Sequence, residues 1–322
     1  WQIDGGTIEG GSITTTEGAT LEFTSNYENS LDGVTLDIEA QLDNYDQVRI
    51  DNGLTVNGTL TAFGNGDLIF NSDSSGQLLG GTGDLIFNSD QTVADNQIRI
   101  EGDTTLTIGS ELTLSGGNLT INSLNNNGTS RLLNLGTIRA DLINETIVID
   151  PDLFENKGTL EALENSIVEI TGNYTQTAGI TNLQDGTLDI TGMGNIENGS
   201  LVGSGTINAT EIINDSLLNP GHSTGILNLN GNYTQTIDGI LNIEIGGTND
   251  FDKLDISNTA NLSGNLDISL VNNYTPMLGD SFEILTFGAH LGDFTNVNLP
   301  SLSNGLEWDT QLDTNSFTLT VV

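Results

Sequence analysis

Apolar residues recur two positions apart along most of the chain, and a polar residue, often threonine, stands between the two members of each pair. Three successive pairs are Leu106 with Ile108, Leu112 with Leu114, and Leu119 with Ile121. This is the period of a β-strand with one buried face. Gly, Asn, Asp and Ser separate the pairs, and these residues tolerate the backbone conformations of tight corners. The pattern predicts many short strands joined by corners and almost no helix.

Such short strands and corners are typical of the sides of a coil rather than of a hairpin meander or a sandwich. Three sides close in roughly 17 to 22 residues, and the next turn of chain stacks parallel to the first about 4.8 Å away. We therefore expect an all-β fold, a right-handed parallel β-helix (β-solenoid) of about sixteen coils with a C-terminal capping region. Residues 1–245 are assigned to the β-helix, and residues 246–322 to the terminal rungs and C-terminal cap of the same solenoid.

The octapeptide GDLIFNSD occurs at Gly66–Asp73 and again at Gly83–Asp90, and seventeen residues separate the copies. If seventeen residues make one coil, the copies lie directly on each other. The expected stacked pairs are Leu68 on Leu85, Phe70 on Phe87, and Asn71 on Asn88. We expect the four apolar members to point inward, and Asp67 and Asp84 to point outward.

Other repeats also predict stacked coils. The pattern Gly-Thr-(Leu or Ile)-x-Ala begins at Gly58, Gly136, Gly158 and Gly205. DQVRI is echoed by NQIRI fifty residues later, and GNYTQT occurs at Gly172–Thr177 and Gly231–Thr236. Identical side chains on neighbouring coils can form hydrogen-bonded or stacked ladders. The repeats are thus explained by structure alone, without a ligand.

The charge of the chain limits the kinds of partner that it can bind. It carries 44 Asp and Glu against six Lys and Arg, which leaves a formal net charge of −38. Such a surface repels phosphate backbones and anionic lipids, so we expect no nucleic-acid partner. No apolar run approaches the roughly twenty residues that span a bilayer, so we expect no membrane insertion by this segment. The chain has no cysteine, which excludes disulfides and thiolate metal sites. It begins at Trp1 without a methionine, which fits a mature secreted protein or an excised fragment.

Parallel β-helices also include polysaccharide-cleaving enzymes, so catalytic residues must be sought. A uronate lyase needs clustered basic residues or calcium, whereas the basic residues here are scattered: Arg49, Arg99, Arg131, Arg139, Lys157 and Lys253. A hydrolase needs converging carboxylates, and 44 acids make chance clusters uninformative. Aromatic platforms for sugar rings are scarce, since Trp1 and Trp308 lie at opposite ends of the chain. We assign no catalytic residue and expect no enzyme activity.

Metal and cofactor sites are also not expected. His222 in NPGHST and His290 after FGA have no local metal-ligand spacing, so both are interpreted as ordinary loop histidines. Asp250, Asp252 and Asp255 in TNDFDKLD could hold calcium, but they lack the spacing of known calcium loops, and turn closure explains them better. No cofactor is therefore assigned, with calcium as the lesser alternative.

Two stretches resemble a known family. GGTIEGGSITT, LDGVTLD, GLTVNGTL, TLTIGSELTLSGG, LGTIRADL and ENKGTLEALENS resemble the repetitive passenger-like regions of cyanobacterial and planctomycete exoproteins. The segment from LNPGHSTGILNLNGNYTQ through LNIEIGGTNDFDKLDISNTANLSGNLDISLVNNYTPMLGDSFEILTF to GLEWDTQ looks like the last rungs and cap of autotransporter-type adhesins. The resemblance implies a secreted or cell-surface protein used in adhesion or matrix building, with no active-site residue to carry over.

We therefore expect a non-enzymatic extracellular protein that acts in adhesion or in building extracellular matrix through a repetitive acidic surface. Its expected partners are cell-surface or matrix glycans or other copies of itself. One alternative is a structural filament subunit that stacks end to end, since the ends of a β-helix offer strand edges. A second alternative is a polysaccharide-active β-helix enzyme.

Overall fold

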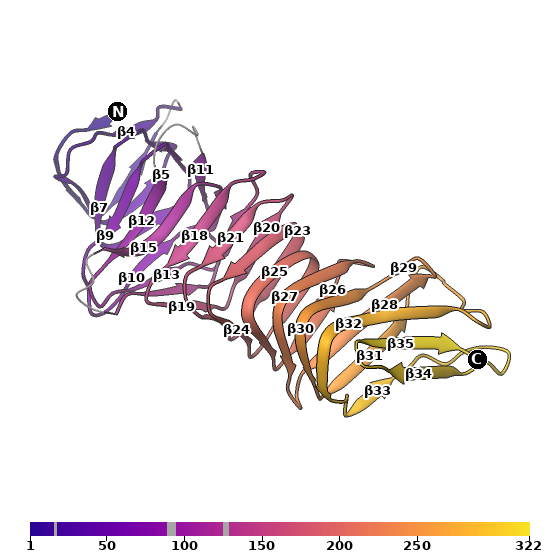
Figure 1. Cartoon of the computed structure of the whole chain (residues 1–322). Coiled ribbons are helices and arrows are strands. Elements are labelled where there is room, and N and C mark those ends of the chain that lie inside the picture. Colours follow the sequence, from indigo (N-terminus) through magenta and orange to yellow (C-terminus); the bar gives the residue numbers. More distant parts are fainter. Residues whose placement is uncertain (16–17, 89–94, 125–128) are drawn as a thin grey trace. The chain divides into compact units, whose positions relative to one another are not determined.

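The computed structural model describes residues 1–15, 18–88, 95–124 and 129–322, and within these residues it is all-β. The chain forms stacked parallel coils, a β-solenoid of about 12 turns (Figure 1). The contacts divide it into two units, Trp1–Gly172 and Asn173–Val322. The predicted fold class is confirmed, although the coils are fewer and longer than expected. The assignment of residues 246–322 to terminal rungs and a cap stays a prediction.

The first unit has three sides, and each side is a parallel ladder whose strands come from successive coils. Side I contains β2 (Gly6–Glu9), the first halves of β5 (Asn29–Asp37) and β7 (Gln47–Val56), β9 (Asp67–Phe70), β12 (Asn96–Glu101), β15 (Leu119–Leu124), β18 (Thr146–Asp150) and β21 (Ile167–Ile170). Side II contains β3 (Ser12–Thr14), the second halves of β5 and β7, β10 (Gln77–Gly80), β13 (Thr105–Ile108), β16 (Arg131–Asn134) and β19 (Leu153–Asn156). Side III contains β1 (Gln2–Ile3), β4 (Leu21–Phe23), β6 (Ala40–Leu42), β8 (Thr59–Phe63), β11 (Asp84–Asn88), β14 (Thr113–Gly116), β17 (Thr137–Ala140) and β20 (Thr159–Leu163).

The core of this unit is built from inward-facing residues stacked along each side. On side III, register places Leu60, Leu85, Leu114, Ile138 and Leu160 on one another, and all five are buried. Burying each such side chain contributes roughly 1.5–3 kcal/mol. The coil is thus stabilised by many thin apolar layers, as the small number of aromatic residues predicts.

The second unit repeats this plan with three sides of its own. Side IV contains β22 (Tyr174–Gln176), β24 (Met193–Ile196) and the ends of β25 (Ser200–Asn214), β27 (Ile226–Gln235), β30 (Lys253–Leu262) and β32 (Ser281–Gly292). Side V contains the starts of β23 (Ile180–Ile190) and β25, then β26 (Leu217–Pro220), β28 (Ile240–Gly247), β31 (Asn265–Leu270) and β33 (Asn296–Asn298). Side VI contains the end of β23, the middle of β25 and the earlier parts of β27, β30 and β32.

Some strands of the second unit pair antiparallel, from β28 onward. The short β29 (Asp250–Phe251) folds back on β28, and β35 (Ser316–Val321) pairs antiparallel with β32 and with β34 (Trp308–Leu312). Because β35 pairs with the part of β32 that belongs to side VI, the hairpin of β34 and β35 continues that side.

The predicted stacking of the two GDLIFNSD copies is wrong. The first copy forms β9 on side I, where Leu68 lies between Val48 and Ile98. The second forms β11 on side III, where Leu85 lies between Leu60 and Leu114. Asn88 pairs with Phe63 instead of Asn71, and Ser89 and Asp90 lie outside the described residues.

The error arises from the length of the coil. Ala40 pairs with Leu60 and Leu60 with Leu85, so these coils take 20 and 25 residues. Seventeen residues therefore carry the chain across only two of the three sides. The inward orientation of Leu68, Phe70, Leu85 and Phe87 is nevertheless confirmed, since all four are at most 1% exposed. Every side requires the same alternation of inward and outward residues, so one sequence suits two sides.

Two of the four Gly-Thr-(Leu or Ile)-x-Ala copies, in contrast, do stack on each other. Thr137 pairs with Thr159 and Ala140 with Ala162, so β17 and β20 lie in register on side III. The glycine before each threonine is needed at the corner, because a Cβ on Gly158 would lie 2.1 Å from the carbonyl oxygen of Gly136. The glycine of the repeat is therefore explained by the close approach of backbones on neighbouring coils, which supports the interpretation that the repeat is structural.

Candidate functional site

The second unit has a pocket of about 230 Å³ on the outer face of side V. Its floor comes from outward-facing residues of neighbouring strands. Val202 of β25 pairs with Asn219 of β26, and the register that joins Leu218 to Leu241 brings Asn219 beside Asn242 of β28. Two residues further along β28, Glu244 lines the same pocket. The pocket is therefore a product of register between coils.

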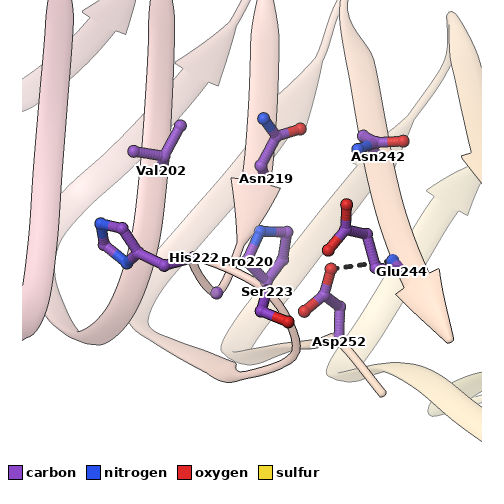
Figure 2. A pocket seen from close by; sticks show the side chains of 9 residues that line it. Val202, Asn219, Pro220, His222, Ser223, Asn242, Glu244 and Asp252 are labelled. Carbon is purple, nitrogen blue, oxygen red and sulfur yellow. Dashed lines mark hydrogen bonds between the residues drawn. The ribbon is translucent and has the colours of Figure 1, made fainter. Parts of the chain in front are cut away.

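A loop and a turn close the sides of the pocket. Pro220 ends β26, His222 and Ser223 belong to the loop that follows it, and Asp252 comes directly after β29 (Figure 2). Figure 2 shows the carboxylates of Glu244 and Asp252 lying toward each other, with the amides of Asn219 and Asn242 nearby. Side chains of four kinds, carboxylate, amide, imidazole and hydroxyl, thus surround one small space.

Asp252 is the structural centre of this arrangement. It is 1% exposed, and its two carboxylate oxygens accept the backbone N–H groups of Gly225 at 2.9 Å and Glu244 at 2.8 Å. Burial raises the pKa of Asp252 to about 7, and the nearby charges of Glu244 and Asp250 act in the same direction. The two N–H bonds oppose this shift without cancelling it. Asp252 therefore fastens the loop after β26 to strand β28.

Gly221 allows this contact to form. Its φ of +84° lies in the left-handed region, and a Cβ at this position would lie 2.7 Å from Oδ1 of Asp252. The backbone N–H of Gly221 also donates to the carbonyl oxygen of Gly203 at 2.9 Å. Glycine is therefore required here for both backbone conformation and the approach of the carboxylate.

Asn219 leaves a hydrogen-bond acceptor without a partner. Its Oδ1 atom is buried and accepts no hydrogen bond from the residues that the structure describes. Buried polar atoms are nearly always paired, with protein or with solvent and ligand atoms. Asn219 also lines the pocket, so rotation of its side chain would bring this oxygen to a donor inside it.

The residues considered for calcium do not converge. Asp252 faces the pocket, Asp250 accepts the hydroxyl of Thr224, and Asp255 accepts the hydroxyl of Thr286 at 2.7 Å. Among the described residues, no group of three or more His, Cys, Asp and Glu is arranged to hold a metal ion. Both carboxylate oxygens of Asp252 accept backbone N–H groups, and this acidic segment carries no calcium proposal.

The other predicted residues lie apart from one another. Five of the six basic residues form ion pairs with acids of their own unit: Arg49 with Glu101, Arg99 with Asp67, Arg139 with Glu161, Lys157 with Glu155, and Lys253 with Glu283. His290 lies against Phe287, with ring centroids 5.1 Å apart. Trp1 is 80% exposed in the first unit, and Trp308 donates from Nε1 to the carbonyl of Pro300 in the second. None of these residues lines the pocket.

The sequence pattern indicated His222 and Asp252 separately and did not predict that they line the same pocket. It did not single out Asn219, Asn242 or Glu244. Their period-two spacing marks them as outward-facing, but only the register between β25, β26 and β28 shows that they share a pocket. No local motif could have revealed it.

No known family model matches the chain, and no curated protein matches it. The structure shows a parallel β-solenoid. The resemblance to exoproteins and autotransporter passengers stays a prediction. Within the described residues there is also no helix that could cross a membrane.

Proposed function

We propose that this chain is a non-enzymatic, secreted or cell-surface β-solenoid that acts in adhesion or in building extracellular matrix. Its partners are hydrated glycans or other copies of itself, bound through rows of polar side chains. The support comes from the outer surface of the coils, where similar side chains recur at the spacing of neighbouring strands, about 4.8 Å.

One ladder on side VI carries the argument. Register aligns five outward-facing polar residues on five successive coils: Thr187, Thr206, Asn228, Asp255 and Thr286. The first unit has a comparable ladder on side III: Thr59, Asp84, Thr113, Thr137 and Thr159. Hydroxyl, amide and carboxylate groups at regular spacing suit hydroxyl-rich ligands, and weak contacts to such rows add by multivalency.

A graded set of variants tests this proposal. Protein immobilised on beads is expected to adhere to cell-surface polysaccharide or to bead-bound protein, while the soluble monomer binds weakly. Replacing Thr206, then Asn228, then Thr286 by alanine should reduce bead adhesion stepwise. Complete loss from a single substitution would contradict a distributed surface, as would wild-type beads that fail to adhere.

The polysaccharide-active alternative is favoured by one observation, the pocket that holds Glu244 beside Asp252 with its raised pKa. Both oxygens of Asp252 are already bound to backbone N–H groups, which gives the buried carboxyl a structural explanation. Release of reducing or unsaturated ends from a polysaccharide panel, lost in Glu244→Gln, would establish catalysis and overturn the non-enzymatic proposal. Electron microscopy of the purified chain separates isolated particles from the end-to-end filaments of the other alternative.

A further inference from the structure

The pocket on side V has the size of a site for one small polar ligand. Its volume of about 230 Å³ is several times the ~30 Å³ of a water molecule. It lies below the ~300–1,000 Å³ of pockets that hold drug-sized ligands. Apolar surface from Val202 and Pro220 stands beside the polar groups, so one face of a ring could pack there while its substituents form hydrogen bonds.

The polar groups favour a ligand that donates hydrogen bonds and carries positive charge. Glu244 contributes a carboxylate, and Oδ1 of Asn219 is a buried acceptor with no partner among the described residues. Asp252 adds a second carboxyl group, and Asp250 lies close enough to act on it electrostatically. A protonated amine offers three donors and one positive charge, which matches this surplus of acceptors.

We propose that the pocket binds a hexosamine residue with a free ammonium group, the ring lying against Val202 and Pro220 and the ammonium lying between the side chains of Glu244 and Asn219. This site assignment rests on the proposed function, since it names the glycan class that the protein would recognise. A metal ion is disfavoured because the described residues contain no group of three His, Cys, Asp or Glu side chains placed to ligate one. A lysine side chain of a protein partner would supply the ammonium without the ring, so the experiment separates the two.

The test is a titration of the soluble monomer at near-neutral pH, followed by NMR or calorimetry, with glucosamine as the probe. N-acetylglucosamine and glucose are the neutral ring controls, and ethanolamine is the ammonium control without a ring. We expect glucosamine to bind at least tenfold more tightly than any of the three. Equal affinity for glucosamine and N-acetylglucosamine would overturn the role of the charge. Equal affinity for ethanolamine would overturn the role of the ring.

Two pocket variants and one control localise the binding. Glu244→Gln and Asn219→Leu should each weaken glucosamine binding at least tenfold, with folding verified by circular dichroism. Asp238→Asn removes one charge from an exposed residue of the same unit outside the pocket and should leave the affinity unchanged. An equal loss of affinity in Asp238→Asn would show that glucosamine responds only to the net charge of the protein. Unchanged affinity in Glu244→Gln would show that glucosamine binds outside the pocket. Either result overturns the proposal.

The same variants distinguish this proposal from the proposed function. If wild-type beads adhere to polysaccharide while the monomer shows no Glu244-dependent glucosamine binding, the pocket proposal fails alone. If the monomer binds glucosamine through Glu244 while wild-type beads adhere to nothing, the pocket proposal holds and adhesion fails. If both hold, Glu244→Gln beads should lose only part of their adhesion.

Discussion

Asn134 donates from its side-chain amide to Oδ1 of Asn156, which lies one coil further along side II, at 2.8 Å, and both residues are fully buried. Oδ1 of Asn134 also accepts the backbone N–H of Gly136 at 3.1 Å. Amides stacked between coils thus satisfy both each other and the corner backbone. The ladder of asparagines expected for Asn71 and Asn88 exists in this fold, but it lies inside the core and involves residues outside the octapeptide repeat.

Removing one member of this ladder should destabilise the first unit. Asn156→Ala takes away one of the two acceptors of the Asn134 amide and leaves a small buried space, so we expect a loss of about 1–3 kcal/mol in the free energy of unfolding. Chemical denaturation measures it. Asn198→Ala, at an exposed asparagine, is the control and should change stability by less than about 0.5 kcal/mol. Similar effects of the two substitutions would contradict a structural role for the buried ladder.

The orientation of β11 predicts very different effects for two of its residues. Phe87 is 1% exposed, so Phe87→Asp places an unpaired charge in a narrow core and should cost more than about 4 kcal/mol or prevent folding. Asp84 is exposed, and Asp84→Ala should be nearly neutral. Thermal unfolding of both variants provides the comparison, and equal effects would mean that the strand faces the other way.

These residues show which features of the fold can be predicted from the sequence. Alternation predicts which side chains point inward, because a strand has a period of two on whichever side of the coil it lies. Alternation contains no information on coil length, so the partners of Leu68 and Leu85 could not be predicted from it. The pocket around Asp252 depends on the register between β25, β26 and β28 and on the turn at Gly221, so alternation could not predict it either.

Asp252 should make stability depend on pH in an unusual direction for an acidic residue. Its folded pKa is raised from 3.8 to about 7, so the folded state binds the proton more tightly than the unfolded state. The associated stability is fully present below about pH 4 and is lost as the pH rises through about 7. We expect melting temperature to fall across this window in wild type, and Asp252→Asn to flatten that part of the profile. A wild-type profile that rises across the window would contradict the raised pKa.

Added cations should stabilise the protein by screening. Thirty-eight uncompensated negative charges repel one another along the coils, and salt reduces that repulsion. Because Asp250, Asp252 and Asp255 do not converge, millimolar magnesium should raise the melting temperature about as much as calcium. Sodium chloride at matched ionic strength should come close to both. A large stabilisation by calcium alone that disappears in Asp252→Ala would reveal a specific site and contradict this expectation.

The two copies of the octapeptide offer a matched comparison on the outer surface. Ile69 lies on side I between Arg49 and Arg99, which register places on the coils before and after it. Ile69 is only 3% exposed although it points outward, whereas its counterpart Ile86 on side III is only partly buried and has Thr61 and Ser115 as neighbours. The guanidinium groups of the two arginines reach acids, Arg49 pairing with Glu101 and Arg99 with Asp67 at 3.0 Å. From this register and the burial of Ile69 we infer that the apolar stems of the arginines cover the isoleucine.

The arginine cover predicts that one substitution has two different effects in identical sequences. Ile69→Thr should cost about 1–3 kcal/mol, because it removes buried apolar surface and introduces a hydroxyl beneath the arginine stems. Ile86→Thr should cost less than about 1 kcal/mol, since water already reaches that side chain. Arg99→Ala should destabilise the protein and also shrink the difference between the two threonine variants, because it uncovers Ile69. Denaturant unfolding of the single and double variants measures this coupling, and additive effects of Arg99→Ala and Ile69→Thr would show that arginine does not shield the isoleucine.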